Sequence, residues 1–162
     1  MAGDAFLQIQ GISGSATDSE HNHWIEISSF GFSITKPEYV LGKSSQTDTI
    51  EGAHVSDVHI SKKVDKTSPK LASAACDPKA TFNSATIALC GRSGPKAITV
   101  NVGGLPRYME YKLTNVSIKS YSVSGGNGYA TEELDLEFDE IEWTYTDGNI
   151  RGKWNLTDNT GS

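Results

Sequence analysis

The sequence predicts an all-β-dominated domain, a two-sheet β-barrel or sandwich with one short lateral α-helix. Three observations support this prediction. Apolar and polar residues alternate through most of the 162 residues, as on strands whose successive side chains face opposite sides. The alternation changes phase at three places, which indicates strands that bend. All five prolines fall outside the alternating segments, as expected because proline interrupts the hydrogen-bond ladder of a sheet.

The expected strands follow one another along almost the whole chain. Each is marked by apolar residues two positions apart. These residues are Leu7 and Ile9; Ile25 and Ile27; Phe30, Phe32 and Ile34; Val58 and Ile60; Ile87 and Leu89; Ile98, Val100 and Val102; Met109, Tyr111 and Leu113; Val116 and Ile118; Leu134, Leu136 and Phe138; and Ile141, Trp143 and Tyr145. Glycine-rich turn sequences at 124–128 and 92–95 predict hairpins between neighbouring strands.

The three phase changes fall at Ser28-Ser29, between Leu113 and Val116, and at Asp139-Glu140. One extra residue returns the apolar side chains to the buried face, and at the third place we expect a β-bulge. Bent strands of this kind wrap from one sheet to another and close a barrel or a tight sandwich.

One short helix is expected at about 68–76. Ser68 is a suitable N-cap, and Pro69 fits the first helical position. The Asp77-Pro78 pair ends the helix, because the residue before proline disfavours helical dihedrals. Leu71 and its neighbours form only a narrow apolar face, so the helix covers one side or one end of the β core.

Two segments show weak periodicity. We expect a domain over 1–147, an extended loop within it over 37–53, and a C-terminal tail over 148–162. Structureless loops longer than ~12–15 residues are uncommon in compact domains and are usually functional or disordered. We interpret the loop as an arm that orders against a partner, with apolar anchors at Val40, Leu41 and Ile50. A tolerated excursion without function remains the alternative.

The charge balance argues against two classes of partner. Fourteen basic and twenty acidic residues give a net charge of −6, which disfavours nucleic acid and anionic membranes. Residues 51–100 are net basic between two net acidic regions, so copies could attract each other. No apolar run reaches the ~20 residues of a membrane helix, and the first ten residues do not look like a signal peptide. We therefore expect cytoplasmic synthesis and no membrane insertion.

Catalytic and metal-binding signals are weak. His21-Asn22-His23 has a spacing that some metal sites use, but its polar neighbours favour a solvated turn. The alternating carboxylates between Glu132 and Glu142 favour a wetted sheet surface or an interface wall over a glycosidase pair. Cys76 and Cys90 form no Cys-x-x-Cys motif. The sequence therefore predicts no catalytic residue, metal or cofactor.

Several runs of residues resemble one family along roughly 4–146. These are Phe6-Leu7-Gln8-Ile9, Gly11-Ile12-Ser13-Gly14-Ser15, Asp18 to His23 leading into Trp24–Phe30, His59–Leu71, Leu113–Ser122, and Thr131-Glu132-Glu133 running into Phe138 and Trp143-Thr144-Tyr145. Their order and spacing are similar to those of the haemolysin-coregulated proteins (Hcp), the tube proteins of type VI secretion. The 37–53 loop matches the family in position more than in sequence, and the tail after Asp147 is uninformative.

The resemblance implies a two-sheet β-barrel with a lateral helix, six copies in a ring, and rings that stack into an expelled tube. It implies sheath and spike proteins as partners, effector proteins carried in the ring lumen, and export without a cleaved signal peptide. It implies no enzymatic activity. The loop would contact the next ring or a neighbour through Leu41, Lys43, Ser44, Ser45, Gln46, Thr47, Asp48 and Ile50. Ser29, Gly31 and Ser33 would face the lumen with small side chains, although the same residues also suit a plain solvent face.

Two other interpretations remain open at this stage. One is a β-sandwich module that binds carbohydrate or another ligand through Trp24, Trp154 and the carboxylates. The other is a metal-dependent hydrolase that uses His21, His23 and the acidic strand. Trp24 and Trp143 lie in alternating strands and are expected in the core, which weakens the first of these two.

Overall fold

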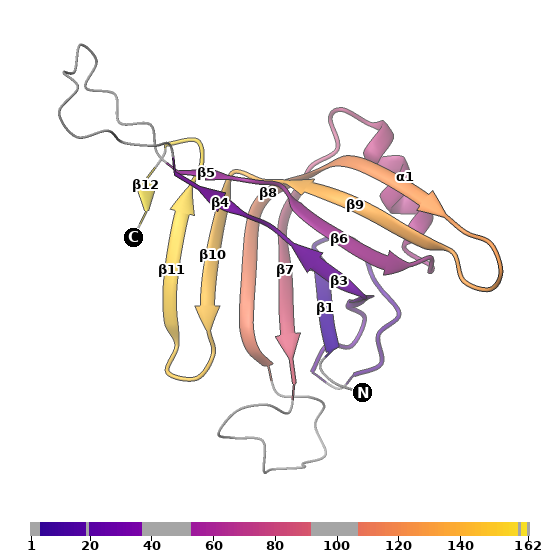
Figure 1. Cartoon of the computed structure of the whole chain (residues 1–162), viewed down its shortest axis with the longest axis horizontal. Helices are drawn as coiled ribbons and strands as arrows, with labels where there is room; N and C mark the ends of the chain where they lie inside the picture. The colour runs from indigo at the N-terminus through magenta and orange to yellow at the C-terminus, as the bar shows by residue number, and fades with distance from the viewer. Residues whose placement is uncertain (1–3, 19, 37–52, 92–106, 159, 162) are drawn as a thin grey trace.

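The computed structural model describes residues 4–18, 20–36, 53–91, 107–158 and 160–161. Within them the chain forms two antiparallel sheets that share one long strand, β8 (Arg107–Ser124) (Figure 1). The other elements are β1 (Asp4–Ile9), β2 (Ile25–Ile27), β3 (Ser29–Gly31), β4 (Ile34–Thr35), β5 (His54–Val55), β6 (Val58–Lys63), α1 (Ser68–Cys76), β7 (Phe82–Cys90), β9 (Thr131–Glu137), β10 (Glu140–Tyr145), β11 (Ile150–Asn155) and β12 (Thr160–Gly161).

The two sheets differ in size. The large sheet has the strand order β12-β11-β10-β8-β7-β1-β2, and the small sheet has the order β3-β6-β9-β8. A separate pair, β4 and β5, flanks the 37–52 segment. The main core fills the space between the two sheets, and Leu71 of α1 is fully buried in it. The all-β class with one helix is thus confirmed for the described residues, and the hydrogen-bonded strand order is open rather than closed into a barrel.

The three phase changes in the sequence are the places where the chain passes from one sheet to the other. At Ser28 it leaves β2 of the large sheet and enters β3 of the small sheet. Within β8, residues up to Thr114 pair with β10 and residues from Ser117 pair with β9. Near Asp139 the chain returns from β9 to β10. The predicted bent strands are confirmed, because each extra residue keeps the apolar side chains on the inner face of both sheets.

The corner near Asp139 is held by a second corner in β8. Asn115 has the left-handed φ of 55°, and its amide donates to the Asp139 carboxylate. The Asp139 backbone N–H donates to the Thr114 carbonyl at 3.0 Å. The predicted bulge at Asp139-Glu140 is therefore wrong in detail: the chain bends between two strands there, and register shifts lie instead between Ile118 and Ser120 and between Leu89 and Cys90.

The predicted helix is confirmed at Ser68–Cys76, with Pro69 in its first turn. Its N-cap residue is Thr67 rather than Ser68. The Ser68 hydroxyl is used differently, because it accepts the Asp65 N–H at 2.9 Å and donates to Glu132. The helix ends before Asp77, whose extended backbone matches the restriction imposed by Pro78.

The segment 148–162 differs from the irregular tail expected from its sequence. β11 pairs with all of β10, and Trp154 lies opposite Ile141 and packs against the main core. Local alternation does not reveal this strand, because only Ile150 and Trp154 of it are large and apolar; its pairing with β10 determines its conformation. The strand expected at 98–102, the turn at 92–95 and the extended loop (residues 37–52 of it) lie outside the described residues.

Candidate assembly surfaces and the buried polar anchor

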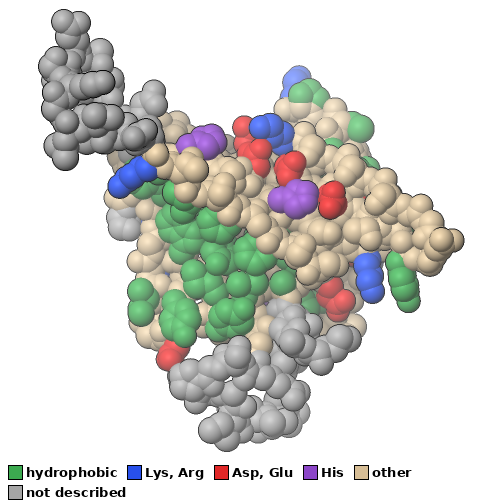
Figure 2. All heavy atoms as spheres, viewed as in Figure 1, with side chains coloured by type: hydrophobic (Ala, Val, Ile, Leu, Met, Phe, Trp, Pro, Cys, Tyr) green, Lys and Arg blue, Asp and Glu red, His purple; other side chains and the backbone are tan. Residues whose placement is uncertain are grey.

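The outer face of the small sheet carries two cross-strand rows of polar residues. One row is Gly31, His59, Asp135 and Ser120, and the other is Ser29, Ser61, Glu133 and Ser122. Figure 2 shows imidazole and carboxylate side chains gathered on this face. We call these two rows the polar face. Two of the three small residues singled out in the sequence, Ser29 and Gly31, therefore lie together on one solvent-facing surface.

Hydrogen bonds organise the centre of the polar face. The His59 Nδ1 lies 2.8 Å from Asp135 Oδ1, and the Ser120 hydroxyl donates to Asp135 Oδ2 at 2.7 Å. The hydrogen bond to Asp135 raises the pKa of His59 above its usual value. The bonds from Ser120 and then His59 lower the pKa of Asp135. In a Ser-His-Asp catalytic triad the serine hydroxyl donates its hydrogen bond to the imidazole, whereas Ser120 donates to the Asp135 carboxylate. The three residues therefore form a charged surface group rather than a triad.

The third small residue, Ser33, lies beyond β3 and outside both rows. Its N–H donates to the Ser56 hydroxyl at 2.8 Å, and its carbonyl accepts the Ser56 N–H at 2.9 Å. At Gly31 a Cβ would meet nothing within 4 Å, so a larger side chain there would project into open space. The eight loop residues expected at a neighbour contact, Leu41 to Ile50, lie outside the described residues.

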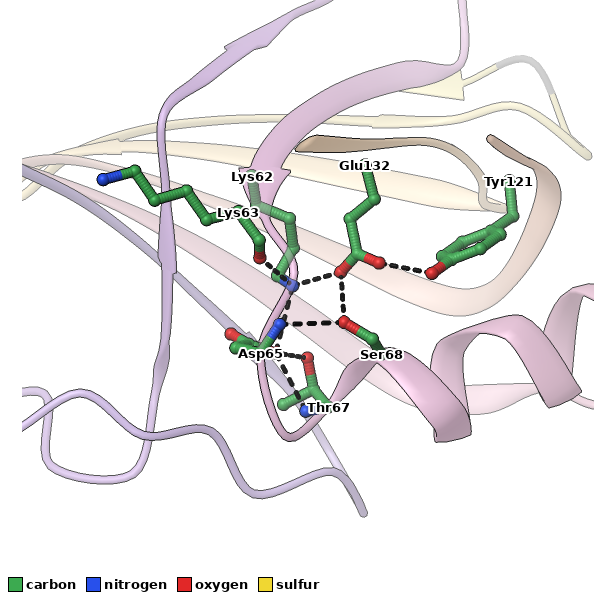
Figure 3. Close-up of polar contacts among 7 residues, drawn as sticks. All are labelled: Lys62, Lys63, Asp65, Thr67, Ser68, Tyr121 and Glu132. Atoms are coloured by element: carbon green, nitrogen blue, oxygen red, sulfur yellow. Dashed lines mark hydrogen bonds and ion pairs between the residues drawn. The ribbon is translucent and has the colours of Figure 1, made fainter. Parts of the chain in front are cut away.

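A buried ion pair lies on the inner side of the small sheet, where β6 and β9 meet the start of α1. Lys62 and Glu132 both have 0 % side-chain exposure and contact each other directly (Figure 3). The Lys62 ammonium also contacts Asp65 Oδ1 at 3.1 Å and the Lys63 carbonyl at 2.8 Å. Three acceptors thus match the three N–H donors of the ammonium group, as a buried charge requires.

The carboxylate of this pair is equally well bonded. Glu132 Oε1 accepts the Ser68 hydroxyl at 2.9 Å, and Oε2 accepts the Tyr121 hydroxyl. Burial and this hydrogen bond raise the pKa of Tyr121 to about 12. The cluster therefore joins β6, β8, β9 and the first turn of α1, and we call it the polar anchor. It positions the helix, and its central ion pair is fully buried.

The sequence contained a signal for the polar anchor that its interpretation missed. Lys62 continues the buried phase of Val58 and Ile60, and Glu132 shares the phase of Leu134 and Leu136. A charged residue in the apolar phase of a strand needs a partner of opposite charge in the next strand. The two residues are direct cross-strand partners in the observed register.

His21 is not part of a solvated turn, contrary to the expectation from its polar neighbours. Its side chain is fully buried, stacks on Phe6 at 4.6 Å and meets the edge of Trp24 at 4.8 Å. Its Nδ1 lies 2.7 Å from Asp18, and its Nε2 lies 3.0 Å from an Arg107 guanidinium nitrogen. Because arginine only donates, Nε2 accepts and Nδ1 donates to Asp18.

This arrangement separates the two histidines proposed for a metal site. His23 is exposed and has a left-handed φ of 67°, so it does not share a face with His21. Among the described residues there is no group of three potential metal-binding side chains. The hydrolase interpretation is therefore not supported by the geometry of its own residues.

The tryptophans do not form a sugar-stacking platform either. Trp24 packs in a second core cluster with Phe6, under the Arg107 guanidinium at 5.0 Å. Trp143 and Trp154 are half-buried against the main core, as expected for the first of them. No helix in the described part of the chain is long and apolar enough to span a membrane.

Comparison with known proteins gives the class and then the family. The chain is similar over 99 % of its length to all of a solved structure titled "Structure of a type six secretion system protein", with 25 % identity and a TM-score of 0.79. The family model described as "Type VI secretion system effector, Hcp" matches residues 6–145. The chain therefore belongs to the Hcp family of type VI secretion.

Other solved structures show the same fold. Hcp1 from Salmonella typhimurium matches over 100 % of both chains, with 20 % identity and a TM-score of 0.79. A mutant of Hcp1 from E. coli EAEC 042 matches over 96 % of this chain and 99 % of that chain, with 22 % identity and a TM-score of 0.74. No curated protein matches this sequence.

Proposed function

We propose that this protein is a structural tube subunit of the type VI secretion system. Copies form six-membered rings, the rings stack into the inner tube that is expelled, and the tube carries effector proteins. One observation supports this most strongly: the family match spans residues 6–145, and the structural likeness extends over 99 % of this chain and all of the matched secretion-system protein. The function is architectural rather than enzymatic.

The polar face is our candidate for the wall of the lumen. Its serines and Gly31 leave room for a passing protein, and its charged groups are already hydrogen-bonded to one another. A wall whose polar groups are satisfied gives a cargo protein few strong contacts to hold it, so cargo slides. Ser33 belongs to the same proposed surface at its margin.

The segment 37–52 is our candidate for contact with a neighbouring copy or ring. Lys43 and Asp48 supply its charged contacts, and Leu41 and Ile50 supply its apolar anchors. Spike and sheath proteins are the other proposed partners. We propose that the chain is made in the cytoplasm and leaves the cell with the tube, without a cleaved signal peptide.

Negative-stain microscopy of the purified full chain tests the proposal. We expect six-fold rings, and tubes at higher concentration. Secretion assays with the producing bacterium add a second test: the uncleaved protein appears in the medium only when the secretion apparatus is intact. Particles the size of one chain at every concentration would overturn the proposal.

A further inference from the structure

The exposed large apolar side chains of the described residues gather mostly at two separate places. Ile150 and Tyr145 lie on the large sheet and are 66 % and 41 % exposed. Tyr129, Val123 and Val64 lie at the end of the β8–β9 hairpin and are 77 %, 52 % and 44 % exposed. Exposed apolar groups that cluster rather than scatter mark interaction sites.

The first place is a continuation of the main core. Leu89, Met109, Tyr145 and Ile150 form one cross-strand row, and Tyr111 and Trp143 belong to the next. We call these six residues the apolar face; Figure 2 shows hydrophobic side chains gathered over β7, β8 and β10. Together the two rows make this face of the large sheet as apolar as a face buried in a core. At its β10–β11 end no described residues cover it.

The cover provided by the small sheet stops part of the way across this face. Phe30 and Phe32 reach Tyr111, with ring centroids 5.3 and 5.4 Å away. Beyond Tyr111 lie Tyr145 and Ile150, which face no opposing strand of the described residues. The other face of β10 and β11 carries charged residues such as Glu140 and Lys153, so only one face of this hairpin is suited to a partner.

The second place projects from the opposite side of the molecule (Figure 1). The β8–β9 hairpin turns through Gly126 and Gly128, and Tyr129 lies beneath the Lys63 ammonium at 4.6 Å from the ring centroid. The Val64 N–H donates to the Ala130 carbonyl, which holds the end of β6 against the hairpin. Tyr129 lies on the Lys63 face of the small sheet, whereas Val123 is the cross-strand partner of the buried Glu132 and lies on the opposite face, so the end of the hairpin is apolar on both faces. We call Val64, Val123 and Tyr129 the hairpin tip.

We infer that the hairpin tip of one copy docks on the apolar face of the next copy. This inference rests on the proposed ring function. A cyclic ring is a head-to-tail assembly, so each subunit needs two different and complementary patches, and this chain has a projecting one and a sheet-like one on opposite sides. A second copy is the occupant because the chain itself carries both halves of the contact.

The size and composition of the two patches suit such a contact. Tyr129 and Ile150 are the most exposed of these side chains, at 77 % and 66 %, and Tyr145 is 41 % exposed, so a partner would bury mainly these three as the apolar centre of a contact. Tyrosine and tryptophan are also enriched at the energetically important centres of interfaces. The continuity of the apolar face with the core resembles an obligate interface, where one core is divided between two subunits.

Two single variants test the inference: Tyr129→Asp at the hairpin tip and Ile150→Asp at the apolar face. Both side chains are largely exposed, so neither change should alter folding, which circular dichroism and thermal melting check. We expect each variant to lose rings, with at least a tenfold rise in the concentration needed for assembly in light-scattering chromatography. Tyr108→Asp is the matched control, because Tyr108 is exposed on the opposite face of β8 and should keep rings.

Mixing the two variants gives the sharper result. The Tyr129→Asp chain keeps an intact apolar face, and the Ile150→Asp chain keeps an intact hairpin tip. An equimolar mixture should therefore form a species of two chains and stop there, because both remaining surfaces are blocked. A mixture that stays at the mass of one chain would overturn the pairing of tip with face.

Other outcomes are equally decisive. Rings that persist in either single variant, while the wild type also forms rings, overturn this inference and leave the proposed function intact. Rings lost in the Tyr108→Asp control overturn the assignment of the contact to these two surfaces. A wild-type chain that never assembles overturns the proposed function and the inference together.

Discussion

Removing one partner of the polar anchor should strongly destabilise the fold. Lys62→Met replaces a fully buried ammonium with an apolar side chain of similar length and leaves the Glu132 carboxylate buried without its counter-charge. Breaking a buried ion pair in this way costs about 3–5 kcal/mol. In a domain of this size each kcal/mol lowers the melting temperature by roughly 2–4 °C, so a fall of about 6–20 °C is expected.

Urea unfolding followed by circular dichroism measures the effect, with the surface pair as a control. Lys119 contacts Asp57 at 3.1 Å but its side chain is 58 % exposed. Lys119→Met should therefore change the free energy of unfolding far less than Lys62→Met does. The double variant Lys62→Met with Glu132→Leu should recover most of the loss, because the fully buried Glu132 carboxylate is removed together with its partner. A Lys62→Met protein as stable as the Lys119→Met control would refute the reasoning.

Three further predictions follow from single positions. Asn115→Ala should lower stability by ~1–2 kcal/mol in urea melts, because alanine disfavours the left-handed φ of 55°, whereas Asn115→Gly should lose less; equal losses would contradict this. Gly14→Ala should destabilise strongly, since a Cβ would lie 2.1 Å from the Trp24 carbonyl oxygen, while Gly31→Ser, with nothing within 4 Å of its Cβ, should melt like wild type. The Tyr121 pKa of about 12 lies above the ~10 of an unfolded tyrosine, so the protonated hydroxyl stabilises the fold fully below pH 10, and this stabilisation is lost between pH 10 and 12. Tyr121→Phe should therefore flatten the dependence of the free energy of unfolding on pH in that window. An unchanged slope would count against the hydrogen bond to Glu132.

Much of the architecture could be predicted from local patterns because strand alternation and sheet crossings leave a periodic signal. The extra residues at Ser28, Asn115 and Asp139 mark the crossings, since apolar side chains must keep facing the core on both sheets. The helix at 68–76 could be placed because Pro69 and Pro78 restrict the backbone at both ends.

The remainder depends on tertiary contacts that no local pattern records. His21 is buried because Phe6, Trp24 and Arg107, from distant parts of the chain, close around it. β11 forms because β10 offers a free edge. In the candidate site, Ser29 and Gly31 could be placed on one face from their spacing, but their alignment with the His59–Asp135 pair depends on the register between β3, β6 and β9.

The central claim is that identical chains close into a ring, and a solution mass measurement tests it most directly. Sedimentation equilibrium of the purified full chain over a wide concentration range should give a species of six times the 17.4 kDa chain mass. A mass of one chain at every concentration would contradict the account.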